Sequence, residues 1–213
     1  MHGIAGLLMK KISIRFIEDR DAEAVLNIYD YYVQNTIISF EYETPTIEEY
    51  RQRIKTNTAL YPWLVCEIDG QIAGYAYGST HRYRTAYQWS PESTIYVSPD
   101  FHRKGIARLL YETLFGLLKL QGYVNVFAGV GLPNDKSIGF HRALGFEEIG
   151  IFKKIGFKHG NWHDTHWFQL QINDHAIPPA MPLRTEEAVH TESYSAVLQK
   201  ANEQAQQLSA SLT

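Results

Sequence analysis

Cysteine is almost absent from this chain: Cys66 is the only one among 213 residues. A single thiol excludes a disulfide within the chain and a zinc site built on several cysteines. The scarcity fits a reducing compartment, so we expect a cytoplasmic protein. Cys66 ends the apolar run of residues 63–66, a pattern typical of a buried strand. We therefore interpret it as a packed structural thiol rather than a nucleophile.

Long hydrophobic runs are also missing. The apolar stretch at residues 4–9 follows no basic segment and is too short to span a bilayer. We interpret residues 1–11 as a flexible N-terminal extension. No other stretch is long and apolar enough for a membrane helix, so we expect no membrane partner.

An excess of positive charge is the third absence. The chain has 20 Lys and Arg against 23 Asp and Glu, a formal net charge of -3. A general nucleic-acid binder needs a basic excess to neutralise phosphates, so we expect no nucleic-acid partner. Hydrophobic residues make up 45% of the chain, which is ordinary for a globular protein and sufficient for a core.

The periodicity of the apolar residues predicts one α/β domain over residues 12–174. Asp69 and Gly70 favour a tight hairpin, and Thr46 with Glu49 forms a capping box at a helix start. The predicted strands cover residues 12–17, 63–68, 72–77, 94–97, 123–130, 146–157 and 162–172. The predicted helices begin at Asp19 and at Thr46, and two more cover residues 103–121 and 133–145.

The composition changes after the last predicted strand. Residues 175–213 begin with a proline-containing linker and continue as a polar segment with an amphipathic helical stripe. The stripe consists of Tyr194, Val197, Leu198, Ala201, Ala205 and Leu208. Such a stripe packs on its own domain, on a partner subunit, or on a partner that arrives later, and the sequence leaves all three open.

The most informative segment is residues 95–108, where a strand ends and a helix begins. Gly105 and Ala107 are small, so the backbone there can approach a ligand closely. The unpaired amides of a helix start and the helix dipole favour an anion. Arg103, Lys104 and Arg108 add positive charge. This chemistry suits a pyrophosphate, although the single glycine is neither a dinucleotide fingerprint nor a Walker loop.

Residues 102–107, His-Arg-Lys-Gly-Ile-Ala, resemble the acetyl-CoA signature of the GCN5-related N-acetyltransferases, the GNAT superfamily, with His in place of Gln or Arg at the first position. Three further blocks, residues 92–99, 131–135 and 158–164, resemble the phosphinothricin and methionine sulfoximine N-acetyltransferase branch, as does His141. Three separated blocks in the right order are more specific than any one motif.

The resemblance covers roughly residues 12–172 and implies a GNAT-type domain with a mixed, mostly antiparallel sheet flanked by helices. It implies acetyl-CoA as cosubstrate, no metal, and a homodimer. The residues implied to bind acetyl-CoA are Ile95, Tyr96, Val97, Arg103, Lys104, Gly105, Ile106, Ala107, Arg108 and Asn134.

Two residues are implied to take part in the chemistry. Attack on a thioester needs a neutral amine, so the site needs a base, and Glu92 matches that position, acting directly or through water. His141 could act as a base, protonate the departing thiolate, contact the substrate, or only pack against Phe146. A backbone N–H near Val97 is expected to stabilise the oxyanion.

The implied substrate is an amino acid with a second anionic or strongly polar group, such as phosphinothricin, methionine sulfoximine or methionine sulfone. Arginine forks suit carboxylate and phosphinate oxygens. Detoxification and herbicide resistance follow from such substrates. The expected substrate-binding residues are Arg84 and Tyr87, with weaker matches at Phe40, Tyr77 and Arg82.

Other interpretations remain open at this point. His159, His163 and His166 are too loosely spaced to indicate a metal site. The chain could acetylate another amine, such as a peptide N-terminus or a polyamine, although nearby arginines disfavour a polycation. It could also be a non-catalytic acetyl-CoA sensor, which would have no turnover for a Glu92→Gln substitution to remove.

Overall fold

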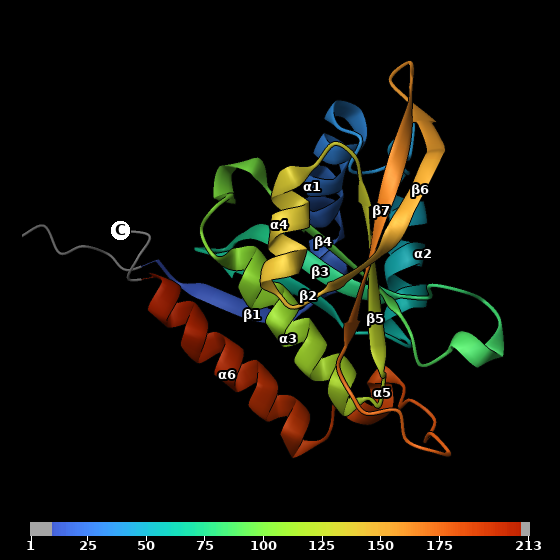
Figure 1. Cartoon of the computed structure of the whole chain (residues 1–213). Helices are drawn as coiled ribbons and strands as arrows, with labels where there is room; N and C mark the ends of the chain where they lie inside the picture. The colour runs from blue at the N-terminus through green and yellow to red at the C-terminus, as the bar shows by residue number, and fades with distance from the viewer. Residues whose placement is uncertain (1–9, 210–213) are drawn as a thin grey trace, which may run out of the picture.

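A computed structural model of the chain describes residues 10–209; the expected flexible segment at residues 1–9 lies outside that range. The chain folds around a seven-stranded sheet with the order β1-β2-β3-β4-β5-β7-β6, and helices cover both faces (Figure 1). This confirms the predicted α/β fold. The strands are β1 (Ile12–Phe16), β2 (Trp63–Ile68), β3 (Gln71–Ser79), β4 (Glu92–Val97), β5 (Asn125–Gly131), β6 (Glu147–Lys158) and β7 (Asn161–Gln171). The helices are α1 (Ala22–Asn35), α2 (Ile47–Thr58), α3 (Ile106–Leu120), α4 (Asp135–Ala143), α5 (Thr185–Ala188) and α6 (Glu192–Ser209).

Two of the predicted helix starts are wrong and one is confirmed. The hydroxyl of Thr46 accepts the amide of Glu49, as the capping box predicts. The first helix begins at Ala22, because Asp19 starts a short 3-10 turn instead. The third begins at Ile106 rather than Arg103, because Arg103 has a φ of 62°, outside the helical region.

The sheet is antiparallel except at one place. β4 pairs with β3 along its whole length but with β5 only where Glu92 faces Phe127, and this one pairing is parallel. Beyond that pair the two strands separate, so the second half of β4 has a neighbour on one side only. The largest buried cluster lies on the α3 side of the sheet, and a second, aromatic-rich one lies beneath α1 and α2.

Cys66 is fully buried in β2, between Ile14 of β1 and Gly74 of β3. Burial raises the pKa of its thiol to about 12, so the thiolate form is rare near neutral pH. The structure therefore supports a packing role for this side chain.

The C-terminal stripe packs on its own domain. α6 lies along α3 and beside β1, the edge strand of the sheet (Figure 1). Tyr194, Ala201 and Ala205 are almost completely buried there, and Val197, Leu198 and Leu208 pack against the same core. Of the three alternatives left by the sequence, the structure supports the first.

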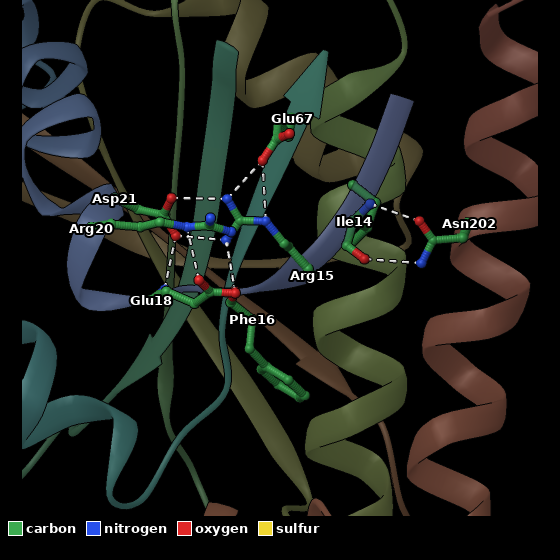
Figure 2. A network of polar contacts seen from close by, with 8 residues as sticks. All are labelled: Ile14, Arg15, Phe16, Glu18, Arg20, Asp21, Glu67 and Asn202. Atoms are coloured by element: carbon green, nitrogen blue, oxygen red, sulfur yellow. Dashed lines mark hydrogen bonds and ion pairs between the residues drawn. The ribbon is translucent and has the colours of Figure 1, made fainter. Parts of the chain in front are cut away.

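A partly buried ion-pair network ties β1 to β2 and to the 3-10 turn that precedes α1 (Figure 2). The guanidinium of Arg15 donates to both carboxylate oxygens of Asp21, at 2.6 and 2.8 Å, and to Glu67 at 2.7 Å. Burial alone would raise the pKa of Asp21, but hydrogen bonds from Arg15 and from the amide of Glu18 outweigh it, so this pKa lies below its usual value.

We expect Asp21→Ala to lower the free energy of unfolding by about 2–3 kcal/mol, because it leaves a partly buried arginine without its main partner. Because the folded-state pKa of Asp21 is lowered, its contribution is complete above the unfolded pKa of about 3.9 and is lost as pH falls through the folded value. The variant should therefore lose less stability than wild type on acidification.

Urea denaturation at pH 7 and across acid pH measures both effects. Asp19→Ala is the matched control, because it removes a carboxylate from an exposed ion pair. The side chain of Asp19 is highly exposed and lies 3.6 Å from that of Arg51. The control should change stability by less than about 0.5 kcal/mol. Equal effects of the two substitutions would contradict the role given to the network.

Candidate active site

The separation of β4 from β5 opens two neighbouring cavities on the side of α3 and α4. The smaller, about 160 Å³, lies between the strands and is lined by Glu92, Ser93, Tyr111 and His141, among others. The larger, about 530 Å³, runs over the start of α3. Ile38, Ile95, Asn134 and Ser137 line both, so the two cavities form one cleft. All ten residues predicted to bind acetyl-CoA line this cleft.

The turn before α3 has the conformation of an anion-binding loop. Gly105 is the N-cap of α3 in the left-handed conformation, with a φ of 76°, and no side chain caps the helix. The amides that follow Gly105 begin the helix without intrahelical partners, so they can serve a ligand. Arg103 and Lys104 stand beside them, and the ammonium of Lys104 donates to the carbonyl of Asp100 at 2.9 Å.

His102, the departure from the signature, anchors this turn to the end of β4. Its Nε2 lies 3.0 Å from the carbonyl oxygen of Val97 and 2.9 Å from the hydroxyl of Tyr32, which itself donates to the same carbonyl. The side chain therefore joins the turn to both β4 and α1.

Backbone alternation sets which amides of β4 face the cleft. Phe127 of β5 donates to the carbonyl of Pro91, and Ser98 donates to Ala73 on the β3 side. Because successive residues of a strand point their backbone groups to opposite sides, the amides of Ile95 and Val97 point toward β5. β5 is no longer paired there, so these two amides face the cleft.

Glu92 lies at the last point where β4 and β5 pair, and its Oε2 is 3.2 Å from Nδ1 of His81. The His81 ring is stacked on Phe127 at 4.7 Å and meets Trp167 edge-on at 5.1 Å. Both side chains are largely buried. Sequence reasoning missed His81. The feature that could have identified His81 is the register of β3 and β4. Ser79 pairs with Glu92, so the residues that follow Ser79 lie close to the Glu92 carboxylate.

His141 is buried on α4, where it packs against Phe146, as one of its four interpretations predicts, and also lines the smaller cavity. Its ring meets Phe146 edge-on at 5.1 Å. Its Nδ1 lies 2.8 Å from the carbonyl of Ser137, so Nδ1 carries the hydrogen. Burial lowers the pKa of His141, which keeps the ring neutral. Nε2, buried and without a hydrogen-bond partner among the described residues, is then an acceptor at the smaller cavity.

The predicted substrate-binding residues separate into two groups. Arg82 and Tyr87 line a third cavity of about 400 Å³, together with His81, Phe127 and Trp167. Residues of β6 form its apolar wall: Ile149, Gly150, Ile151 and Phe152. Arg84 lines an adjoining shallow cavity with Arg82 and Tyr87.

Tyr77 and Phe40 occupy other positions. Tyr77 stacks on Trp63 with ring centroids 3.9 Å apart. Phe40 fills the space above Gly156, where an added Cβ would lie 2.7 Å from its ring. Neither is among the residues that line the third cavity.

Lys158, quoted above only as part of a motif, holds one wall of the cleft. Its buried ammonium donates to the carbonyls of Val33, Thr36 and Ser39 at 2.6, 2.9 and 2.7 Å. Burial lowers the pKa of this ammonium. These bonds fix the segment after α1 that carries Ile38 into the cleft.

Within residues 10–209, no group of three or more His, Cys, Asp or Glu side chains could hold a metal ion. Of the three histidines considered above, His163 bonds to the carbonyl of Lys158 and His166 pairs with Glu148. No helix of the described chain combines the length and apolar character that crossing a membrane requires.

Comparison with known proteins places this geometry in a family. The sequence profile of the acetyltransferase (GNAT) domain matches residues 14–167. A phosphinothricin N-acetyltransferase of Streptomyces viridochromogenes is 37% identical over 176 residues, which cover 82% of this chain and 94% of that protein. An L-methionine sulfoximine/L-methionine sulfone acetyltransferase of Salmonella typhimurium is 31% identical, covering 79% and 99% of the two chains.

Solved structures agree. A GNAT superfamily phosphinothricin acetyltransferase from Sinorhizobium meliloti, crystallised in complex with acetyl-CoA, superposes with a TM-score of 0.75 at 35% identity, covering 81% of this chain and 94% of that one. Profile, sequence and structure coincide over the same domain. The chain therefore belongs to the GNAT family of N-acetyltransferases, on the branch of the phosphinothricin and methionine sulfoximine acetyltransferases.

Proposed function

We propose that this enzyme transfers the acetyl group of acetyl-CoA to the amine of a small amino-acid-like substrate such as phosphinothricin, methionine sulfoximine or methionine sulfone. The observation that carries the proposal is one continuous cleft that joins an anion-binding turn to Glu92. The relatives named above and the acetyl-CoA complex of the Sinorhizobium meliloti protein support it. Its role is detoxification in a reducing cytoplasm, with herbicide resistance as one consequence.

The cleft suits the two ends of acetyl-CoA, which supplies an activated thioester when bound. The first amides of α3, with Arg103, Lys104 and Arg108, bind the pyrophosphate. The amides of Ile95 and Val97 face the gap beside β4, where they bind the pantetheine and the thioester oxygen. Asn134 caps α4 by accepting the amide of Ser137 at 3.1 Å and forms the opposite wall.

Glu92 is the general base in this proposal. The amine nitrogen attacks the acetyl carbonyl carbon, the new N–C bond forms, and the C–S bond breaks. The proton lost by the amine goes to Glu92, directly or through one water, and the departing thiolate takes up a proton. The hydrogen bond from His81 fixes the carboxylate, so we assign His81 as its positioning residue.

The state of His141 narrows its possible roles. With the hydrogen on Nδ1, its Nε2 offers a lone pair to the smaller cavity. A neutral ring must first accept a proton before it can protonate a thiolate. We therefore propose that His141 accepts a hydrogen bond or a proton in the cleft, as a second base or a substrate contact, rather than acting as the resting acid.

The third cavity is the proposed substrate site, on the far side of Glu92 from the anion-binding turn. Arg82, whose guanidinium lies 5.9 Å from the ring centroid of Tyr87, offers a fork to the substrate carboxylate, and Arg84 adds charge nearby. The wall formed by β6 suits the methylene or methyl groups of the same substrate. Tyr77 and Phe40 do not line this cavity, so the proposal gives them no direct contact with the substrate.

We also propose a homodimer that forms through β6, the uncovered edge of the sheet. This strand carries a row of exposed apolar side chains, whereas α6 covers the opposite edge. Exposed fractions along it are 53% at Ile149, 47% at Phe152, 57% at Ile155 and 44% at Phe157. An apolar edge of this kind marks an association surface.

The release of CoA thiol, measured with a panel of amines, tests the function. We expect turnover with methionine sulfoximine, methionine sulfone or phosphinothricin, and none with spermidine or a short peptide. Glu92→Gln should lower kcat at least about 100-fold, because it removes the general base, while the Kd for CoA stays unchanged. Glu23→Gln, at an exposed position in the first turn of α1, is the matched control.

Turnover of spermidine or peptide alone would move the substrate to another amine. Tight CoA binding without turnover on any amine would indicate an acetyl-CoA sensor. Full activity of the Glu92→Gln enzyme would remove the proposed base.

His81→Phe separates positioning of Glu92 from packing, because the ring can still stack on Phe127 and meet Trp167. We expect kcat to fall about tenfold, since a hydrogen bond to a charged group contributes about 1.5 kcal/mol or more. The KM for acetyl-CoA should not change. Steady-state kinetics with both substrates measure the split, and His81→Gln, which keeps a donor, should recover part of the loss. An unchanged kcat in His81→Phe would contradict the role.

Ile155→Glu tests the dimer. A carboxylate on the exposed apolar row should convert a dimer to a monomer without unfolding it, as light scattering coupled to size-exclusion chromatography measures. Glu203→Lys, on the exposed face of α6, is the control and should leave the mass unchanged. A dimer that survives Ile155→Glu would place the interface elsewhere.

A further inference from the structure

The helix α6 lies beyond residues 14–167, the part of the chain that matches the GNAT domain. The described chain nevertheless places this helix against two parts of that domain: the edge strand β1 and the helix α3. One of its contacts reaches the turn that we propose to bind the pyrophosphate of acetyl-CoA, and the inference below rests on that proposed function.

Polar side chains of α6 pair with the backbone of β1 along the edge where no further strand is present. The amide group of Asn202 accepts from the backbone N–H of Ile14 at 3.0 Å and donates to the carbonyl of the same residue at 2.9 Å (Figure 2). Gln206 donates to the carbonyl of Ile12 at 2.8 Å, and the hydroxyl of Ser209 donates to the carbonyl of Lys10.

The spacing of residues along a helix is close enough to the spacing along a strand for this pairing to repeat. Four helical residues advance about 6 Å along the axis, and two strand residues advance about 6.8 Å. Residues 202 and 206 therefore meet Ile14 and Ile12 of β1 in the antiparallel sense, and Ser209, three residues further on, meets Lys10 just before the strand. This fixed register determines which side chain of α6 arrives at each point on α3.

Two α6 side chains meet glycines of α3. An added Cβ on Gly116 would lie 3.3 Å from Val197, so the helices approach closely in the middle of α3. At the start of α3, an added Cβ on Gly105 would lie 3.0 Å from Leu208. Leu208 therefore packs directly on the left-handed N-cap residue of the anion-binding turn.

This turn is where such support matters. Arg103 and Gly105 both have positive φ, at 62° and 76°, and Arg103 is a residue type that rarely adopts this conformation. The hydrogen bonds of His102 hold the side of the turn next to β4. Leu208 holds the side next to α3, at the residue whose conformation aims the first helical amides into the cleft.

We propose that the C-terminal helix is a positioning element for acetyl-CoA, in which Leu208 holds Gly105 and with it the anion-binding turn. The edge bonds of Asn202 and Gln206 set the register that delivers Leu208. Because coupling between two equilibria is reciprocal, docking of the last turn of α6 strengthens CoA binding, and CoA binding stabilises that docking. Leu208 is a positioning residue and does not touch the substrate.

Calorimetric titration with CoA and steady-state kinetics of Leu208→Ala test this inference. The Kd for CoA and the KM for acetyl-CoA should rise about fivefold, at the low end of measured couplings between sites, with kcat unchanged. Leu208→Met, which keeps the contact volume, should recover most of the affinity. Val197→Ala is the matched control, because it removes an apolar contact between the same two helices away from the turn.

Hydrogen exchange of the wild-type chain provides a test without any substitution. CoA should slow exchange of the amides of residues 203–209, while those of residues 192–197 change less. Wild-type affinity in Leu208→Ala, equal weakening in Val197→Ala, or no protection of residues 203–209 by CoA would each overturn the inference. A wild-type chain that does not bind CoA at all would instead remove the proposed function on which it rests.

Discussion

The site depends on one constraint in the sheet: β4 and β5 pair at Glu92 and Phe127 and nowhere further along. A strand with a neighbour on one side only leaves every second amide on the other side without a backbone partner. In most proteins such groups are covered by another strand or by water. Here they face a cleft, which is where the proposed function places the thioester of acetyl-CoA. The same point fixes Glu92, because the last paired residue is held more firmly than those beyond it.

Both walls of this opening are held by polar side chains, one buried and one at the edge of the cleft. Lys158 bonds three carbonyls at the end of α1 and fixes the segment that carries Ile38. On the opposite side, His102 bonds the carbonyl of Val97 beside the anion-binding turn. A buried polar group left unpaired is costly, so the buried ammonium of Lys158 strongly favours one geometry of its wall. The side chain of His102 lines the larger cavity and joins the opposite wall to β4 and α1.

The sequence predicted the features whose cause is local. The capping box at Thr46 depends on a few neighbouring residues, so its pattern can be recognised within one segment. The small size of Gly105 is also visible in the sequence, but its left-handed conformation is not, because the predicted helix begins at Arg103. The predicted start of α1 is wrong because residues 19–21 form a 3-10 turn, in which the carboxylate of Asp21 accepts from the amide of Glu18 and, in a tertiary contact, from Arg15. His81 was missed because its pairing with Glu92 depends on the β3–β4 register and on the path of the following loop, which composition does not encode. The structural role of Lys158 was not predicted, because its three carbonyl acceptors lie more than a hundred residues earlier in the chain.

The two edges of the sheet differ in what covers them: α6 covers β1, whereas β6 carries exposed apolar side chains. Edge strands expose backbone groups that can pair with another chain. At β1, the side chains of Asn202 and Gln206 occupy those groups, so association by strand addition is blocked there. At β6 the exposed side chains are apolar, and part of the same strand forms a wall of the third cavity. An interface at β6 would therefore lie next to the proposed substrate site, whereas α6, which covers the opposite edge, reaches the anion-binding turn through Leu208. Under the proposals above, subunits would associate through the β6 edge, whereas acetyl-CoA would bind between β4 and β5 in the middle of the sheet, at the turn that α6 reaches through Leu208.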